Sequence, residues 1–127
     1  MSKTLFIIRG LPGSGKSTLG YLLAGDNSFA ADDYFYDRDK NYNYDATQIS
    51  TAHDYCFNKV KEAMEKGVDK IATCNTFTRK WEYDNYFALA DKYDYTVHEI
   101  ISKGEFGSIH NVPYSVVENM KERFEYE

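Results

Sequence analysis

The sequence predicts a single α/β domain, residues 1–127, with helices on both faces of a short parallel sheet, and three observations favour this class. An apolar run at residues 5–8 leads into a glycine-rich stretch and then into a helical pattern. Segments of strand and helix type alternate along the rest of the chain, which indicates parallel strands joined by right-handed crossovers. The length of 127 residues, 43% of them hydrophobic, allows one core of two or three layers and is too short for two domains.

The glycine-rich stretch, residues 10–18, matches G-x-x-x-x-G-K-S/T, the P-loop that binds nucleotide phosphates. Gly13 and Gly15 lack a Cβ, so successive N–H groups can turn toward one centre at the start of the next helix. Lys16 is expected to reach the β- and γ-phosphates, and Ser17 to ligate Mg²⁺. The predicted fold is therefore a three-layer P-loop NTPase or kinase fold. It is expected to take ATP or GTP, with Mg²⁺, on Gly10, Gly13, Ser14, Gly15, Lys16, Ser17 and Thr18.

The first half of the chain is expected to form two strands and two helices, at residues 4–9, 16–24, 29–31 and 45–66. Leucines at helical spacing mark the first helix, and Gly25 begins the turn that ends it. The segment 34–44 has neither helical nor strand period, so we expect a loop there. Asp45 and Gln48 form a capping box that opens the second helix. Its buried stripe is expected to comprise Ile49, Ala52, Cys56, Val60 and Ala63 or Met64.

The second half continues the alternation with a strand, a helix, a strand and a helix, at residues 70–74, 78–93, 95–101 and from 115 onward. Thr78 is the expected N-cap of the first of these helices, and β-branched residues mark the fourth strand. Residues 102–112 are expected to be loop. Ser115 and Glu118 form a second capping box. The last helix is expected to share one apolar face among Val116, Val117, Met120 and Phe124.

Charge and composition limit the function classes. A formal charge of −5 argues against strong electrostatic binding of nucleic acid, although a local basic cluster would still allow a nucleic-acid end as substrate. No apolar run is long enough to span a membrane, and the N-terminus does not resemble a signal peptide, so we expect a cytoplasmic protein without membrane contact. Cys56 and Cys74 have no metal-binding or redox spacing and are expected to be free thiols.

Asp32 and Asp33 directly follow the second expected strand. The carboxyl ends of parallel strands meet at one edge of the sheet, so these residues should lie beside the P-loop and the segment 74–76. One carboxylate there suits a general base that takes the proton of an attacking hydroxyl, and the other could hold Mg²⁺ water or cap the next segment. The alternative is that both are ordinary turn residues.

The loop that follows is rich in aromatic rings: Tyr34, Phe35, Tyr36, Tyr42 and Tyr44. These rings could stack on the base or sugar of an acceptor, as exposed rings do in proteins that bind single strands. They could equally pack on the edge of the sheet as an aromatic-rich loop. The sequence favours neither interpretation.

Several segments carry a family resemblance: residues 9–18 (RGLPGSGKST), 31–35 (ADDYF), 52–53 (AH), 75–76 (NT), 81–82 (WE), 110–113 (HNVP) and 120–125 (MKERFE). In this order, over nearly the whole chain, they resemble the P-loop kinases of the NEDD4-binding-protein-2-like family and the kinase domain of phage polynucleotide kinase. The resemblance implies the sheet order 2-3-1-4 and ATP-dependent phosphate transfer to a hydroxyl, often a 5′-hydroxyl of nucleic acid. It also implies that Asp32 is the general base, Lys16 the phosphate lysine and Ser17 a metal ligand. With Asp32 as the base, Asp33 is the carboxylate that we expect to hold Mg²⁺.

Three positions differ from the family pattern. Cys74 stands where the family usually has an acidic residue, and Phe77 where it usually has Asn. The arginine-bearing lid is truncated to the run 102–109, which contains no arginine. An arginine on the transferred phosphate is worth about a thousandfold or more in rate. Substitutes could come from a partner chain, from a second copy of this chain, or from Lys103, Arg79, Lys80 or Arg38.

The sequence therefore supports two hypotheses. The first is a small ATP-dependent kinase that phosphorylates a hydroxyl of a nucleic acid, nucleoside or nucleotide. The second is a nucleotide-binding regulatory or interaction module with little catalysis, which engages a protein partner through exposed tyrosines. On either hypothesis a short lid would leave the bound triphosphate exposed and any turnover slow.

Overall fold

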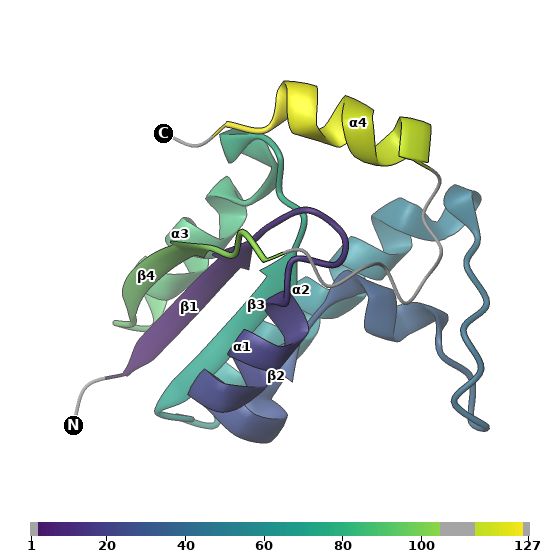
Figure 1. The fold of residues 1–127 in the computed structure, drawn as a ribbon. Helices are drawn as coiled ribbons and strands as arrows, with labels where there is room; N and C mark the ends of the chain where they lie inside the picture. The colour runs from purple at the N-terminus through teal and green to yellow at the C-terminus, as the bar shows by residue number, and fades with distance from the viewer. Residues whose placement is uncertain (1–2, 105–113, 126–127) are drawn as a thin grey trace.

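Four parallel strands form one sheet, and their order agrees with the expectation. In this computed structural model, which describes residues 3–104 and 114–125, the strands are β1 (Thr4–Arg9), β2 (Ser28–Phe29), β3 (Lys70–Asn75) and β4 (Thr96–Ile101). They lie in the order β2-β3-β1-β4, and each adjacent pair is parallel (Figure 1). All carboxyl ends thus point to the same edge of the sheet.

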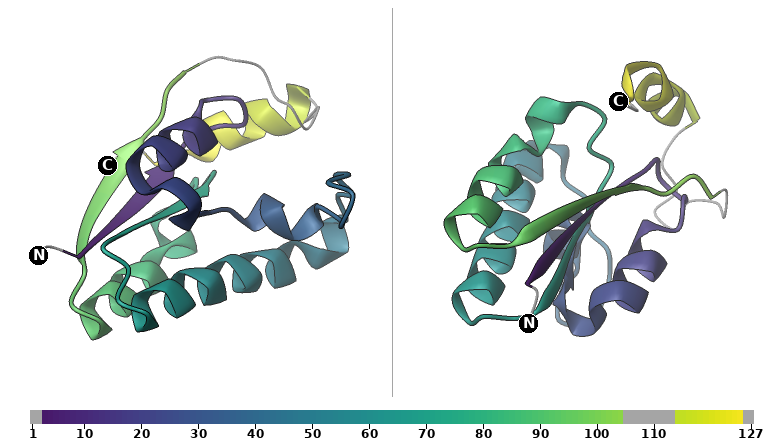
Figure 2. Two further views of the ribbon diagram at one scale, coloured as in Figure 1. Left: turned by 90° about the horizontal axis from the view of Figure 1, so that it is seen from below. Right: turned by 90° about the vertical axis from the view of Figure 1, so that its left-hand side faces the viewer.

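The helices cover both faces of the sheet, which confirms the three-layer arrangement. The helix α1 (Lys16–Ala24) lies on one face, and α2 (Ile49–Glu65) and α3 (Asp84–Lys92) lie on the other (Figure 2). The fourth helix, α4 (Tyr114–Arg123), lies beyond the carboxyl ends of the strands, above the P-loop in the view of Figure 1. It therefore covers the edge at which ligands of parallel sheets bind.

The central strand β1 has apolar side chains on both faces, as expected for a buried parallel strand. Successive side chains alternate between the two faces. Leu5 and Ile7 pack with α2 and α3, in a core that includes Val60, Phe77, Tyr86 and Leu89. Ile8 packs on the other face with Cys74 and with Leu19 and Leu23 of α1. These two layers hold the P-loop between them.

Several element boundaries differ from the expectation. β2 is only Ser28–Phe29 and not 29–31, because Ala31 already begins a 3₁₀ helix, η2 (Ala31–Phe35). The side chain of Asp45 accepts a hydrogen bond from Thr47 N, so it caps as predicted, yet the turn that it caps is the 3₁₀ helix η3 (Ala46–Gln48). α2 begins only at Ile49.

The predicted stripe of α2 is confirmed with one exception. Ala52, Cys56, Val60, Ala63 and Met64 are buried. Ile49 is 41% exposed, since it occupies the first turn of α2, at the end of the helix remote from the core that holds Val60, Ala63 and Met64. On α4, Val116 is 38% exposed although the sequence placed it on the apolar face, while Phe124 is buried just beyond the end of the helix.

The expected helix from Thr78 is divided in two. Thr78 is buried, and its N–H and hydroxyl donate to the two carboxylate oxygens of Glu82 at 3.2 and 2.8 Å. This exchange closes a tight 3₁₀ turn, η4 (Lys80–Glu82), and α3 starts only at Asp84. The N-cap residue of this turn is Arg79, so the prediction of Thr78 as a helix N-cap is wrong, and Thr78 is instead joined to the turn through Glu82.

Arg9, at the end of β1, is completely buried, with 0% of its surface exposed. Its guanidinium donates to the carbonyls of Phe77, Thr78 and Glu125 and forms an ion pair with Glu99 at 3.0 Å. It also lies between two aromatic rings, 4.8 Å from the centre of Tyr83 and 4.6 Å from that of Phe124. One side chain thus ties β1 to β4, to the loop after β3 and to the C-terminal segment.

We predict that Arg9→Met lowers the free energy of unfolding by about 3 kcal/mol or more, because two buried carbonyls and one partly buried carbonyl lose their donor and Glu99 loses its ion pair. The exposed Arg38→Met is the control and should change it by no more than about 0.5 kcal/mol. Urea unfolding measures both variants. Protease digestion should also cut Arg9→Met within α4 before wild type, because the anchor of the C-terminal segment is lost. Equal stability of Arg9→Met and wild type would contradict this account of the fold.

Candidate functional site

The P-loop has the backbone shape that its glycines predict. Gly13 and Gly15 have positive φ angles of 80° and 91°, which residues with a Cβ rarely adopt. Ser14 N donates to Leu11 O, which closes the turn. Gly15 is the N-cap residue of α1, so the first N–H groups of this helix have no acceptor within it and face the open edge of the sheet. This is the geometry of an anion-binding helix N-terminus.

Gly10 lies where two chain segments approach closely. A Cβ at this position would come within 2.3 Å of Ser14 Oγ and 2.7 Å of the carbonyl oxygen of Ser102. Ser102 and Gly104, which follow β4, both donate to the carbonyl of Ser14. The segment after β4 is therefore fastened to the P-loop, and Gly10 makes that contact sterically possible.

Lys16 lies partly buried over the loop, and its Nζ donates to Leu11 O at 3.0 Å. Burial lowers the pKa of Lys16, while the negative charge of Asp32 opposes that effect. Lys16, at the start of α1, and Asp32, in η2, are thus close enough to interact electrostatically. A phosphate placed at the start of α1 would offer Lys16 a better acceptor than the carbonyl of Leu11.

Ser17, Asp33 and Cys74 line one open hollow of about 260 Å³. α1 approaches β3 closely here, since a Cβ on Gly20 would lie 2.5 Å from Cys74 Sγ. Burial raises the pKa of the Cys74 thiol to about 11, so at neutral pH it is a neutral group. Of the three, Asp33 alone brings a carboxylate to this hollow. A hydroxyl and a carboxylate are oxygen ligands of the kind that Mg²⁺ prefers, so the residues fit that ion.

Asp32 faces a different set of groups from Asp33. Its Oδ1 accepts a hydrogen bond from Tyr42 Oη at 3.1 Å. Its charge acts on Lys16 and also on His53, an exposed residue of α2. Asp33 instead folds back, so that its Oδ2 accepts from Ala30 N at 3.0 Å. Asp32 and Asp33 are therefore adjacent in the chain but contact different groups.

Asn75, the last residue of β3, holds the turn that carries both carboxylates. Its buried Oδ1 accepts from Ala31 N at 2.8 Å, and its Nδ2 donates to Thr73 Oγ1. The sequence placed residues 74–76 at this edge but gave Asn75 no role. One feature of the sequence pointed to this role of Asn75. It is a polar residue at the end of a buried strand, and it stands two positions after another polar residue.

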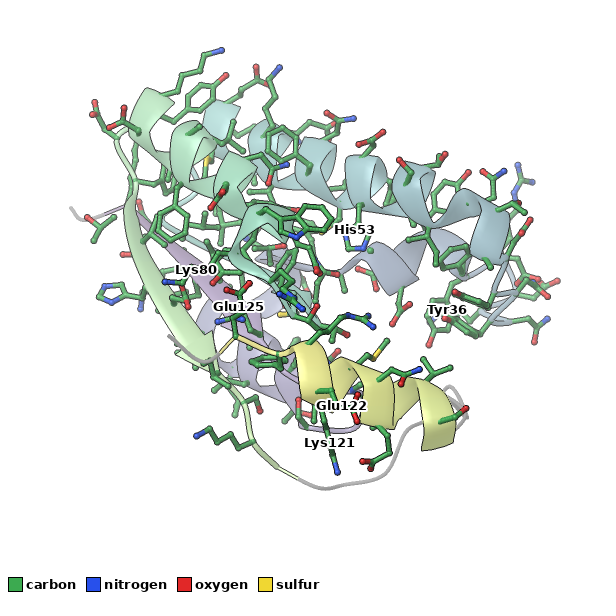
Figure 3. The ribbon with its side chains drawn as sticks, turned by 90° about the horizontal axis from the view of Figure 1, so that it is seen from above. Tyr36, His53, Lys80, Lys121, Glu122 and Glu125 are labelled. Atoms are coloured by element: carbon green, nitrogen blue, oxygen red, sulfur yellow. The ribbon has the colours of Figure 1, made fainter. Side chains whose placement is uncertain are left out.

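His53 stands on the side of α2 that faces the site. Its ring lies 6.2 Å from that of Phe77, and partial burial lowers its pKa, against the opposing charges of Glu82 and Asp32. His53 is therefore expected to be neutral at pH 7. In Figure 3 it is seen between α2 and α4, as is Tyr36.

The cationic residues considered as replacements for a lid arginine lie in separate places. Arg38 is exposed in the loop after η2, and Lys80 is joined to the C-terminal segment, where its N–H donates to Glu125 Oε1 (Figure 3). The sequence did not consider Arg123, whose Nε donates to Thr78 Oγ1 at 3.0 Å. The run 102–109 expected in place of a lid is described only as far as Gly104, and His110 also lies outside the described residues.

A parallel sheet in the order β2-β3-β1-β4, whose central strand runs through a glycine loop into a helix, is the fold of P-loop NTPases and kinases. The chain is 41% identical to human NEDD4-binding protein 2 over 97 residues, which are 73% of this chain and 5% of that protein. It is 30% identical to mouse 2′,3′-cyclic-nucleotide 3′-phosphodiesterase over 103 residues, which are 75% of this chain and 23% of that enzyme. The expected likeness to NEDD4-binding protein 2 is thus confirmed. The matched part of this chain spans only a small fraction of the length of these relatives.

Solved structures agree on the fold. Chaetomium thermophilum Kti12, crystallised with ADP-AlF3, superposes with a TM-score of 0.63 at 14% identity, over 95% of this chain and 80% of Kti12. An unliganded sugar kinase from Janibacter gives a TM-score of 0.51 at 16% identity, over 98% and 69% of the two chains. No protein-family model matches the chain. Among the described residues, no helix is both long and apolar enough to cross a membrane.

We predict that Asn75→Ala loosens the turn that carries Asp32 and Asp33. The free energy of unfolding should fall by about 1–3 kcal/mol, because the buried N–H of Ala31 loses its acceptor. Amide exchange measured by NMR should be at least tenfold faster at Ala31 than in wild type, beyond what the global loss of stability explains. The exposed Asn58→Ala on α2 is the matched control, and unchanged exchange at Ala31 would contradict the assigned role.

Proposed function

We propose that this protein is an ATP-dependent phosphotransferase that moves the γ-phosphate to a hydroxyl group. The observation that carries the proposal is the convergence of the P-loop lysine with two carboxylates at one edge of the sheet, where Lys16 and Asp32 interact electrostatically. Two structural neighbours are consistent with it, since Kti12 was solved with ADP-AlF3 and another neighbour is named as a sugar kinase. The motif resemblance to phage polynucleotide kinase adds a hydroxyl of a nucleic acid, nucleoside or nucleotide as the acceptor.

In the proposed reaction each residue has a separate task. The N-terminal N–H groups of α1 and the ammonium of Lys16 hold the phosphates and offset their charge. Ser17 and Asp33 are the side chains that would hold Mg²⁺, which supplies further charge neutralisation at the β- and γ-phosphates. The acceptor oxygen bonds to the γ-phosphorus as the bond to the β–γ bridging oxygen breaks, ADP leaves, and Asp32 takes the hydroxyl proton.

A second candidate is a nucleotide-binding regulatory or interaction module with little catalysis. The observation that favours it is the neutral Cys74 thiol at a position where the resembling kinases usually have a carboxylate. On this candidate ATP and Mg²⁺ bind while the γ-phosphate stays in place or transfers slowly. Incubation with γ-labelled ATP, Mg²⁺ and a panel of hydroxyl acceptors distinguishes the two candidates.

Lys16→Ala should lower the affinity for ATP–Mg²⁺ at least tenfold while the fold survives, because its charge offsets the phosphates. Titration calorimetry measures the affinity, and circular dichroism checks the fold. Lys66→Ala is the matched control, since Lys66 is an exposed lysine at the far end of α2. Equal affinity in Lys16→Ala and wild type would overturn the nucleotide site.

Asp32→Asn and Asp33→Asn should have different effects. Asp32→Asn should abolish transfer and leave ATP affinity nearly unchanged, since an amide keeps the shape but cannot accept the proton. Asp33→Asn should mainly raise the Mg²⁺ concentration needed for half-maximal binding of ATP. The measurements are labelled-phosphate transfer and a Mg²⁺ titration of nucleotide binding. If Asp33→Asn eliminates transfer while Asp32→Asn keeps it, the two roles are assigned the wrong way round.

A further inference from the structure

Residues 34–44, expected to be irregular, form a folded tyrosine hairpin. Tyr36 and Tyr42 pair as an antiparallel bridge, and Asn43 N donates to Phe35 O at 2.8 Å. At the tip, Asp37 Oδ1 accepts from Asn41 N and Asp39 N, both at 2.9 Å. These bonds, that of Asn41 first, hold the pKa of Asp37 below its ordinary value. The hairpin is therefore a defined surface with a stable negative charge at its tip.

A buried ring anchors the tyrosine hairpin to the core. Phe35 is buried with Ala52 and Cys56 of α2. Its ring contacts those of Tyr34, Tyr42 and Tyr44 at centroid distances of 5.5, 6.1 and 5.2 Å. The surrounding rings keep large outward surfaces, with Tyr34, Tyr36 and Tyr44 exposed by 37, 39 and 55%. Exposed aromatic surface on a rigid base is typical of a stacking platform and not of core packing.

This platform is joined directly to the proposed general base. Tyr42 Oη donates to Asp32 Oδ1, and the rings of Tyr42 and Tyr36 lie 5.2 Å apart. Partial burial raises the pKa of Tyr36, and the charges of Asp32 and then Asp33 raise it further. Tyr36 is therefore a neutral phenol close to both carboxylates. An acceptor held on Tyr36 would lie next to the atom that takes its proton.

The charge on this side of the site is net negative, since residues 31–48 contain five aspartates and only two cations, Arg38 and Lys40. A hollow of about 320 Å³ beside the hairpin is lined by Tyr34, Tyr36, Asp37 and Asp45 among others, and no lysine or arginine of the described chain lines it. Asp37 and Asp45 repel a phosphodiester group that comes within about 8 Å of the hairpin, the screening length at physiological salt, whereas the charge of the γ-phosphate of ATP would be offset by Lys16 and Mg²⁺. A polynucleotide acceptor would have to place its first phosphodiester group near this surface. A free nucleoside offers the same ring and hydroxyl without that charge.

We propose that the tyrosine hairpin is the acceptor site, where Tyr36 stacks on the ring of an uncharged nucleoside and Tyr42 positions Asp32 against the nucleoside hydroxyl. This inference rests on the proposed phosphotransfer and narrows its acceptor from nucleic acids in general to nucleosides. The γ-phosphate passes to the nucleoside oxygen, the proton passes to Asp32, and ADP and a nucleoside monophosphate are the products. Tyr42 is a positioning residue, since it acts through Asp32.

The first experiment compares acceptors in a labelled-phosphate assay with wild-type protein. Each free nucleoside is set against a 5′-hydroxyl oligonucleotide that begins with the same nucleoside. We expect kcat/KM to be at least tenfold higher for the nucleoside, and the difference to shrink as salt rises. A higher kcat/KM for the oligonucleotide would overturn the assignment of acceptor class.

The second experiment separates the two tyrosines. Tyr36→Leu should raise KM for the nucleoside about tenfold or more with kcat and ATP affinity nearly unchanged, and Tyr36→Phe should restore KM. Tyr42→Phe should lower kcat and leave KM nearly unchanged, because the ring remains and only the bond to Asp32 is lost. Phe87→Leu, at an exposed ring of α3, is the matched control. Equal KM in Tyr36→Leu and wild type would overturn the role of the hairpin.

Direct binding distinguishes failure of this inference from failure of the proposed function. Nucleosides are titrated by calorimetry into protein saturated with Mg²⁺ and a non-hydrolysable ATP analogue. Binding that Tyr36→Leu weakens, without transfer to any acceptor, supports the hairpin site and overturns the phosphotransfer. Transfer to another acceptor, with no nucleoside binding, keeps the phosphotransfer and overturns the hairpin site.

Discussion

The buried guanidinium of Arg9 is the interaction on which the arrangement of the candidate site depends. Arg9 directly precedes Gly10, so the residue that starts the P-loop is held by whatever holds Arg9. A rigid planar fork with five donors can serve several carbonyls and a carboxylate at once, whereas a lysine has three donors on a single atom. Here it serves the loop after β3, the strand β4 and the segment after α4. The place of α4 above the P-loop therefore follows from a contact made at the end of β1.

Asn75 holds the turn that carries the two carboxylates in place, as Arg9 holds the start of the P-loop. Both residues end adjacent strands, since Arg9 pairs with Asn75 in the register of β1 and β3. Each is buried, and each satisfies backbone groups of a loop that would otherwise lack partners. Such bonds are costly to lose in a low-dielectric interior, so they define a single conformation for the loops. The site is thus held by two polar side chains at the rim of an apolar core.

The sequence predicted what depends on local pattern and missed what depends on distant contacts. The bounds of α1 and most of the α2 stripe were correct, since glycine chemistry and a 3.6-residue period specify them. The sheet order was correct because the family resemblance implied it. Arg9 gave only the signal of a polar residue that ends a strand, because its partners are up to 116 residues away. The sequence did not predict the tyrosine hairpin for a related reason. A single bridge and the hydrogen bonds of Asp37 hold it, and neither produces an alternation of polar and apolar residues along the chain. The exposure of Ile49 and Val116 depends on where each helix ends relative to the core, which spacing does not encode.

The two sides of the candidate site differ in charge, and this difference would separate the place of the phosphate donor from that of the acceptor. Lys16 and the N-terminus of α1 would attract phosphate on one side, with Asp33 placed to hold Mg²⁺ there, while Asp37 and Asp45 beside the tyrosine hairpin would repel it on the other. A triphosphate is therefore drawn to the P-loop and kept away from the tyrosine hairpin, so donor and acceptor do not compete for one place. The acceptor enters without charge and would leave as a phosphate ester beside these carboxylates. The repulsion that disfavours a charged acceptor would then also weaken the binding of the product and favour its release.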